Sequence, residues 1–287
     1  MILWAQAKIN LGLWVGPRQP TGYHLVDTVM YPIEVKDRIV LEPSHTLRCE
    51  SDMPGVPVGN HNLMMRAYHW AREHWGPLPT VRMAVQKHIP LGAGLGGGSA
   101  DAGAVLRWAW HELGFGPPPA VEGTEAIGMD VPFFVSGRPA RARHYGELLT
   151  PVADRLQGFW VVLANPGWPL ATHEVYRAWD EAGRESDNRI SDVIAGIERG
   201  ELAVDGLHND LEQAAFRVDP RLQAFRQALE RWLFPVPCFL SGSGATYYML
   251  GSDPADPEWA YWAQDRLRER GVAWVTAARL GMGKDEE

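Results

Sequence analysis

Hydrophobic and polar residues alternate over several segments near the start of the chain, as they do in half-buried β-strands. Residues 15–22 read as a loop, and Lys36-Asp37 predicts a turn between two further strands. The pattern predicts a first strand at 7–13 and a second that runs through Val26, Val29 and Ile33. A third strand is predicted at 38–42. The chain is therefore expected to open with antiparallel β-structure rather than with a β-α-β unit.

Later segments carry apolar residues at helical spacing, separated by further extended stretches. Helices are predicted at 62–75, 99–113, 121–127, through Val175, Tyr176 and Trp179, and at 190–199, 210–216, 220–233 and 257–270. Strands are predicted at 80–88, 139–145, 147–152, 159–164, 247–250 and 273–276, with one more that ends in the small-residue loop of segment 238–246. The second half of the chain therefore reads as an α/β sandwich.

A glycine-rich loop, PLGAGLGGGSADA at residues 90–102, lies between the strand at 80–88 and the helix that follows. Glycine loses the most conformational freedom on ordering, so such a density predicts a role other than packing. Ser99 is the predicted N-cap of the helix. Exposed N–H groups and the helix dipole at this junction attract anions. The loop therefore predicts a phosphate site rather than a plain surface turn.

A dinucleotide site is an alternative for this loop, because residues 92–97 formally match G-x-G-x-x-G. However, residues 89–91 separate the loop from its strand. No second strand with an acidic end follows about 20 residues later, as that fingerprint requires. The loop also lacks the lysine of a Walker-type site. A hydride-transfer enzyme is thus disfavoured, and a Walker-type nucleotidase is excluded.

Composition narrows the class of partner further. The 287 residues carry a formal net charge of −8, which argues against a general nucleic-acid binder but leaves a nucleotide site open. Cys49 and Cys238 lie far apart in the sequence and predict neither a disulfide framework nor a zinc site, which fits a cytoplasmic protein. No leader segment or long apolar run predicts a membrane location.

A lysine–asparagine pair in the first strand and one aspartate near the middle of the chain are further candidates for site residues. Lys8 and Asn10 share one face of the first strand, and taken alone such a pair is expected to face solvent. Asp130 lies between a glycine and an apolar cluster, where an aspartate usually caps a helix. The alternative for Asp130 is a base in a cleft.

Three separated motifs resemble those of the GHMP small-molecule kinases, named after galactokinase, homoserine kinase, mevalonate kinase and phosphomevalonate kinase. They are AKINL at 7–11, LGAGLGGGSADA at 91–102 and LSGSGAT at 240–246. Within that superfamily, four more segments are similar to the branch that phosphorylates a cytidylated methylerythritol: GYH at 22–24, NLMMRA at 62–67, GMDVPFF at 128–134 and NDLE at 209–212. Together the seven motifs, in the right order, cover almost the full chain.

The resemblance implies an α+β, two-domain GHMP kinase fold. An N-terminal ribosomal-protein-S5-like α/β domain is expected at 1–155 and a C-terminal ferredoxin-like α/β sandwich at 156–287. The implied reaction is phosphorylation of the 2-hydroxyl of the cytidylated methylerythritol, a small-molecule substrate, by ATP with Mg²⁺. Another GHMP kinase or a catalytically inactive nucleotide-binding relative is the alternative.

The resemblance also implies roles for single residues. Lys8 and Asp130 match the catalytic positions. The ATP-binding positions are Asn62, in the adenine-contacting segment, and Pro90, Gly92, Ala93, Gly94, Leu95, Gly96, Gly97, Gly98 and Ser99. The positions for the cytidine-bearing substrate are Asn10, Tyr23, His24, Tyr176, Gly242 and Ser243. Tyr23 and Tyr176 are expected to stack on the cytosine.

The chain departs from the family pattern at three positions. Ala100 replaces the usual second serine after the glycines, Thr21 replaces an aspartate, and His144-Tyr145-Gly146 replaces a Gly-x-Gly. Because Ala100 removes a hydroxyl, the resemblance leaves the metal ligands unassigned.

The loop glycines are expected to serve the ligand and not the fold. A Cβ at Gly94 or Gly96 would obstruct the close approach of phosphate oxygens or forbid a positive φ. We therefore expect such substitutions to weaken ATP binding with little change in melting temperature.

Overall fold

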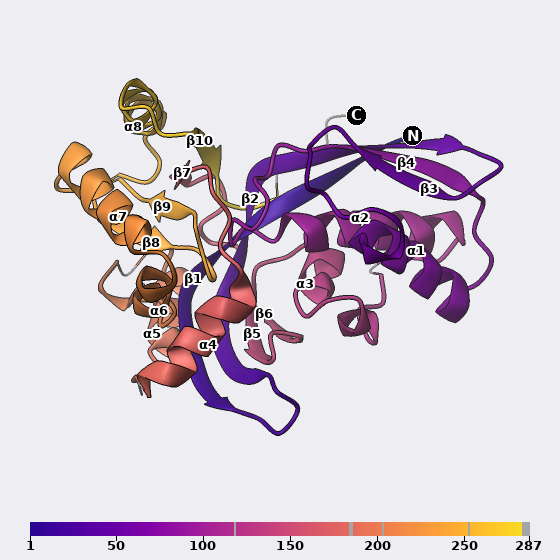
Figure 1. Cartoon of the computed structure of the whole chain (residues 1–287), viewed down its shortest axis with the longest axis horizontal. Helices are drawn as coiled ribbons and strands as arrows, with labels where there is room; N and C mark the ends of the chain where they lie inside the picture. The colour runs from indigo at the N-terminus through magenta and orange to yellow at the C-terminus, as the bar shows by residue number, and fades with distance from the viewer. Residues whose placement is uncertain (118, 184–185, 203, 252, 283–287) are drawn as a thin grey trace.

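Two β-sheets, one in each half of the chain, organise the fold (Figure 1). The structure is a computed structural model that describes residues 1–117, 119–183, 186–202, 204–251 and 253–282. Within these residues, no helix is long and apolar enough to cross a bilayer.

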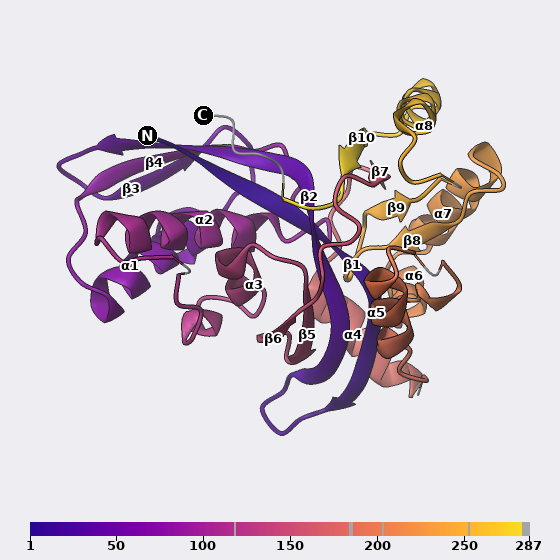
Figure 2. The same ribbon diagram turned by 180° about the vertical axis from the view of Figure 1, so that it is seen from behind.

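The first sheet is built on a long antiparallel pair, β1 and β2, which crosses the whole molecule (Figures 1 and 2). Its path is β3-β4-β2-β5-β6, with β1 paired to β2, and only the β3–β4 pair is parallel. Its strands are β1 (Ile2–Arg18), β2 (His24–Pro43), β3 (Arg48–Ser51), β4 (Val81–Gln86), β5 (Ala140–His144) and β6 (Leu148–Pro151). The predicted antiparallel start is therefore confirmed.

Strand β2 corrects one prediction, because it runs unbroken through the expected turn at Lys36-Asp37. Asp37 is fully buried. Its carboxylate accepts hydrogen bonds from the ammonium of Lys87 and from the backbone N–H groups of His88 and Ile89. These distant partners satisfy a polar residue that would otherwise break a buried strand.

Three helices of the first half cover one face of this sheet (Figure 1). They are α1 (Leu63–His74), α2 (Gly97–Glu112) and α3 (Val131–Ser136). Helix α2 packs against α1, α3 and β1, and its buried face is rich in alanine, which allows close approach. The short helix predicted at 121–127 is a single 3₁₀ turn, Thr124–Ala126.

The second sheet has the order β10-β7-β9-β8 and is antiparallel throughout. Its strands are β7 (Trp160–Asn165), β8 (Cys238–Leu240), β9 (Tyr247–Met249) and β10 (Trp274–Arg279). The helices are α4 (Thr172–Ala182), α5 (Ile190–Glu198), α6 (Glu212–Val218), α7 (Pro220–Trp232) and α8 (Pro257–Glu269). Helices α4 to α7 lie between β7 and β8, and α8 lies between β9 and β10. This order of strand, helices, strand, strand, helix and strand is the ferredoxin-like arrangement, which confirms the expected sandwich.

Two hydrophobic cores lie beneath the sheets, and each draws residues from both halves of the chain. Leu13 and Val26, from the far end of the β1–β2 pair, pack in the second core. Val161 and Leu163 of β7 pack in the first core. The division into domains at residues 155 and 156 stays a prediction, and the long β1–β2 pair connects the two halves on either side of it.

Candidate active site

The glycine-rich loop is held between β1 and loops of the second half. The N–H of Lys8 donates to the carbonyl oxygen of Leu95 at 3.1 Å. Ser241 Oγ donates to the carbonyl oxygen of Gly94 at 3.0 Å, and the N–H of Thr246 donates to that of Ala93 at 3.2 Å. The loop backbone is therefore fixed from both sides, which suits a site that must present N–H groups to an anion.

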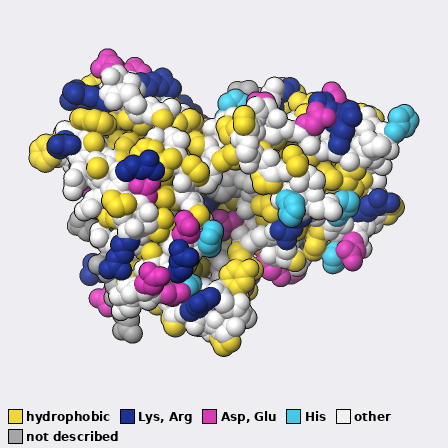
Figure 3. Space-filling view, in the orientation of Figure 1, with side chains coloured by type: hydrophobic (Ala, Val, Ile, Leu, Met, Phe, Trp, Pro, Cys, Tyr) yellow, Lys and Arg dark blue, Asp and Glu magenta, His cyan; other side chains and the backbone are white. Residues whose placement is uncertain are grey.

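A cavity of about 340 Å³ opens beside this loop. Figure 3 shows the surface hollowed between the two lobes of the molecule. The cavity wall includes the start of α2, the β1–β2 pair and the loop between β8 and β9. The residues brought together here include Lys8, Asn10, Pro90, Gly92, Ala93, Gly94, Gly96, Gly97, Gly98, Ser99, Asp130, Tyr176, Gly242 and Ser243.

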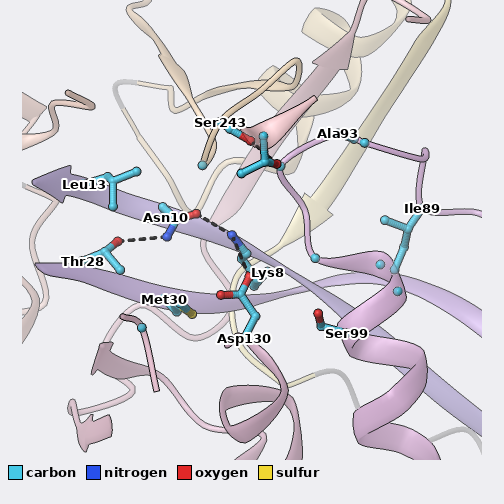
Figure 4. Close-up of a pocket in the computed structure, with 18 of the residues that line it drawn as sticks. Lys8, Asn10, Leu13, Thr28, Met30, Ile89, Ala93, Ser99, Asp130 and Ser243 are labelled. Carbon is cyan, nitrogen blue, oxygen red and sulfur yellow. Dashed lines mark hydrogen bonds and ion pairs between the residues drawn. The ribbon is translucent and has the colours of Figure 1, made fainter. Parts of the chain in front are cut away.

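The side chains of Lys8 and Asp130 meet at the wall of this cavity (Figure 4). Lys8 Nζ lies 3.7 Å from Asp130 Oδ2 and donates a hydrogen bond of 2.6 Å to Asn10 Oδ1. Asn10 Nδ2 in turn donates to Thr28 Oγ1 at 2.9 Å, so the amide orientation is fixed. Burial lowers the pKa of the Lys8 ammonium, and the charge of Asp130 raises it in part.

Asp130 stands at the N-cap position of α3 but does not cap the helix. Its side chain makes no capping hydrogen bond and is 32% exposed, whereas the Lys8 side chain is 5% exposed. The carboxylate therefore points to the cavity, and the helix-cap interpretation of Asp130 is wrong. A carboxylate here can accept a proton from a ligand, and the ammonium of Lys8 beside it can offset negative charge on the ligand.

A second cavity, of about 750 Å³, adjoins the first at Asp130 and Tyr176, which line both. Its wall also includes Tyr23, which is 51% exposed, and His24, which is buried. The rings of His24 and Tyr176 are stacked with centroids 5.0 Å apart. His24 Nε2 lies 2.6 Å from Asp180 Oδ1. An aromatic wall with one fixed imidazole suits a flat heterocycle.

Comparison with known proteins agrees with this geometry. The model of the GHMP kinases N terminal domain matches residues 62–138. The curated 4-diphosphocytidyl-2-C-methyl-D-erythritol kinase of Cereibacter sphaeroides is 36% identical, over 96% of this chain and 98% of the relative. The enzyme of that name from Thermus thermophilus is 38% identical, over 97% of this chain and 96% of the relative. The chain belongs to the 4-diphosphocytidyl-2-C-methyl-D-erythritol kinase family.

A solved structure supports the same family. The crystal structure of a 4-(cytidine 5'-diphospho)-2C-methyl-D-erythritol kinase superposes with a TM-score of 0.80 at 34% identity, over 99% of this chain and 100% of that chain. The GHMP kinase fold expected from the motifs is therefore confirmed. The dinucleotide-dependent oxidoreductase is not supported, because the loop lies within the residues that match the GHMP kinases N terminal domain.

Two predicted ATP-binding residues of this GHMP kinase do not line either cavity. Leu95 is fully buried and holds the loop to β1 through its carbonyl group. Asn62 caps α1, because its Oδ1 accepts the N–H of Met64 at 2.8 Å and its Nδ2 donates to Pro57. Its neighbour Leu63 lines the first cavity instead. An adenine contact by Asn62 stays a prediction.

Two local expectations about the site are wrong. Ser99 is not an N-cap, since α2 begins at Gly97 after Gly96, whose φ of 73° only glycine adopts easily. Lys8 and Asn10 share a face as predicted, but that face is buried under the loop and not solvated. Their partners come from distant segments, which strand periodicity does not reveal.

The loop glycines also contribute to packing, contrary to expectation. A Cβ on Gly94 would overlap the carbonyl oxygen of Ser241 and come within 3.1 Å of the amide nitrogen of Gly244. A Cβ on Gly96 would lie 2.6 Å from the ring of Phe134. Substitution at either glycine should therefore lower stability as well as affinity.

Sequence reasoning missed several residues of the second cavity, among them Tyr145 and Asp180. Thr21, which replaces the family's aspartate, donates to the Tyr145 hydroxyl at 2.8 Å. The Tyr145 ring lies 5.3 Å from that of Tyr23. The departures at Thr21 and Tyr145 are therefore in direct contact, which their separation of more than 100 residues in the sequence does not reveal. Asp180 follows Tyr176 by one helical turn, a spacing that places both on one face of α4.

Proposed function

We propose that this chain transfers the γ-phosphoryl group of ATP to the 2-hydroxyl of 4-diphosphocytidyl-2-C-methyl-D-erythritol, in the non-mevalonate route to isoprenoid precursors. The observation that carries the proposal is the position of the Lys8–Asp130 pair. It lies where a cavity beside a phosphate-binding loop meets a second cavity with an aromatic wall. Family membership supports the same substrate pair.

ATP binds with its phosphates against the glycine-rich loop and the N-terminus of α2. The positive end of the α2 dipole and free N–H groups of the first turn stabilise phosphate oxygens there. Gly94 and Gly96 have φ values of 74° and 73°, so the backbone turns sharply enough to bring successive N–H groups to one ligand. The lining residues from Pro90 to Ser99 are the proposed contacts.

Mg²⁺ accompanies the nucleotide in this proposal. Among the described residues, no group of three or more His, Cys, Asp or Glu side chains could hold a metal ion. Asp130 is paired with Lys8 and is not free to serve as a dedicated ligand. Mg²⁺ commonly binds through substrate phosphates and water, and there it neutralises phosphate charge. We assign no protein ligand to it.

In the chemical step, the alcohol oxygen forms a bond to the γ-phosphorus as the bond from that phosphorus to the β,γ-bridging oxygen breaks, and ADP leaves. Asp130 accepts the alcohol proton or orients the hydroxyl. Lys8 offsets the charge on the transferring group. No covalent enzyme intermediate is needed.

The cytidine-bearing part of the alcohol occupies the second cavity. Tyr23 and Tyr176 supply aromatic surfaces for the base, and base–aromatic stacking contributes about 1–3 kcal/mol per ring. His24, fixed by Asp180, contacts the base edge. Asn10, Gly242 and Ser243 line the first cavity on the side of the second half and contact the alcohol or its phosphates. We further propose a cytoplasmic location, which the two free cysteines support.

The decisive experiment measures ADP release with a panel of alcohols, namely 4-diphosphocytidyl-2-C-methyl-D-erythritol, mevalonate and homoserine. Phosphorus NMR of the product identifies the phosphorylated hydroxyl. We expect turnover with the cytidylated alcohol alone, and a much lower kcat in Asp130→Asn. Phosphorylation of mevalonate or homoserine instead would assign the chain to another activity. ATP binding without turnover of any alcohol would make it an inactive nucleotide-binding relative.

A further inference from the structure

Three buried charged side chains form a cluster directly behind the start of α2. Lys87 Nζ donates to Asp37 Oδ2 and, at 2.7 Å, to Asp101 Oδ2. The side chains of Lys87, Asp37 and Asp101 are 1%, 0% and 6% exposed. The cluster therefore contains two carboxylates and a single ammonium in a poorly hydrated environment, and it carries one excess negative charge when both carboxylates are ionised.

The two carboxylates are not equivalent. Asp37 Oδ1 accepts the N–H groups of His88 at 2.6 Å and Ile89 at 2.9 Å, so both of its oxygens are satisfied. Asp101 Oδ1 is buried and has no hydrogen-bond partner among the described residues. The excess charge is therefore least stabilised on Asp101.

The groups that face Asp101 come from three neighbouring strands and their ends. Lys87 follows β4, Asp37 lies in β2, and Cys49 lies in β3. Burial raises the pKa of Asp101 to about 7, with the charge of Asp37 adding to the effect and that of Lys87 opposing it. Burial and the charge of Asp101 raise the pKa of the Cys49 thiol to about 11, so the thiol stays neutral.

The cluster borders the proposed phosphate site. Lys87 lines the first cavity, and its Nζ would lie 3.3 Å from a Cβ placed on Gly97, the first residue of α2. Asp101 is four residues further along the helix, about 6 Å along its axis. At this range an anion in the cavity and a carboxylate at Asp101 repel each other through a medium of low polarity.

We propose that nucleotide binding beside the glycine-rich loop is coupled to the uptake of one proton by Asp101. The incoming phosphates disfavour the charged carboxylate, which takes a proton from solvent and releases it when the nucleotide leaves. This inference rests on the proposed nucleotide site, and goes beyond it by naming a residue that sets how affinity changes with pH.

The sign of the effect follows from the charges. Well below pH 7 Asp101 is mostly neutral because burial raises its pKa, so the nucleotide meets little repulsion from it. As the pH rises, the carboxylate must gain a proton or remain as a repelling charge, so affinity falls. Because the phosphates raise the pKa of Asp101, we expect nucleotide binding to be roughly tenfold weaker at about pH 9 than at about pH 6.

The test is calorimetric titration with ADP at about pH 8 in Tris and in HEPES, whose ionisation enthalpies differ. The buffer dependence of the heat gives the number of protons taken up. We expect the wild-type protein to take up a measurable fraction of a proton per ADP, because the bound phosphates raise the pKa of Asp101. Asp101→Asn keeps the shape and leaves Lys87 paired with Asp37, and it should take up none of this proton.

Two further variants separate Asp101 from other sources of a proton. Lys8→Met removes another cavity group whose pKa is shifted. Asp52→Asn changes an exposed carboxylate whose Oδ1 accepts the backbone N–H of Lys87. Both should retain the uptake. The ratio of ADP affinity between wild type and Asp101→Asn should also change about tenfold from about pH 6 to about pH 9. The titration of ADP itself is common to both proteins and cancels.

Several results would overturn the inference. One is equal proton uptake in wild type and Asp101→Asn, and another is proton uptake that is lost only in Lys8→Met. A third is a ratio of ADP affinity between wild type and Asp101→Asn that is the same at every pH. The last would show that Asp101 is merely structural. Zero uptake by the wild-type protein refutes the inference even if the variant does not fold. Failure of ADP to bind at all would refute both the proposed function and this inference, whereas binding without uptake refutes the inference alone.

Discussion

Replacing Gly94 by alanine should destabilise the protein and also weaken ATP binding. Gly94 has a φ of 74°, and a Cβ there would overlap the carbonyl oxygen of Ser241, with the carbonyl carbon at 3.0 Å. Both obstacles are backbone atoms of the loop between β8 and β9, so no side-chain rotation relieves them. The loop must move away from the glycine-rich segment.

The size of the loss can be worked from three contributions. Alanine in the left-handed conformation costs about 1–2 kcal/mol. Overpacking against backbone costs about 1–3 kcal/mol. Separation of the loops breaks the hydrogen bond from Ser241 Oγ to the carbonyl of Gly94, worth about 1 kcal/mol. The free energy of unfolding should fall by roughly 3–6 kcal/mol.

Gly114 provides a matched control, because its φ is 76° and a Cβ there would meet nothing within 4 Å. Gly114→Ala should cost only the conformational strain, about 1–2 kcal/mol, and leave ATP affinity unchanged. Urea unfolding followed by tryptophan fluorescence and ATP binding by calorimetry measure both quantities. If Gly94→Ala unfolds at the same urea concentration as Gly114→Ala, the packing argument fails and the glycine serves only phosphate approach.

Three further outcomes are expected. Asp130→Asn should lower kcat by about 10²–10⁴ with ATP affinity little changed, and Lys8→Met should have the same effect. Near-normal turnover of either variant, measured as ADP release, would show that the pair has no catalytic role. The double change Tyr23→Ala and Tyr176→Ala should raise KM for the cytidylated alcohol about 10²-fold or more while KM for ATP stays constant, and an equal rise for both substrates would contradict stacking. Asp180→Asn, which removes the charge beside the buried histidine of the second cavity, should raise KM for the cytidylated alcohol about tenfold, with Asp180→Glu recovering part of the loss; unchanged kinetics would show that this carboxylate has no positioning role.

Several features of this protein follow from the sequence because they depend on neighbouring residues only. Alternation along β1 predicts that Lys8 and Asn10 share a face, since side chains repeat every two residues in a strand. The density of glycine ahead of an alanine-rich segment predicts a loop that meets a helix N-terminus. The element order of the second half likewise predicts the sandwich, and the structure confirms it within a few residues at most boundaries.

Other features depend on partners that lie far away in the chain, and only the tertiary structure decides them. Lys36-Asp37 reads as a turn, yet β2 continues because Lys87 and two backbone N–H groups satisfy the Asp37 carboxylate. Asp130 reads as a helix cap, yet its carboxylate faces Lys8. Burial of a polar group is favourable only where complementary donors and acceptors meet it, and the folded chain, not the local pattern, brings those groups together.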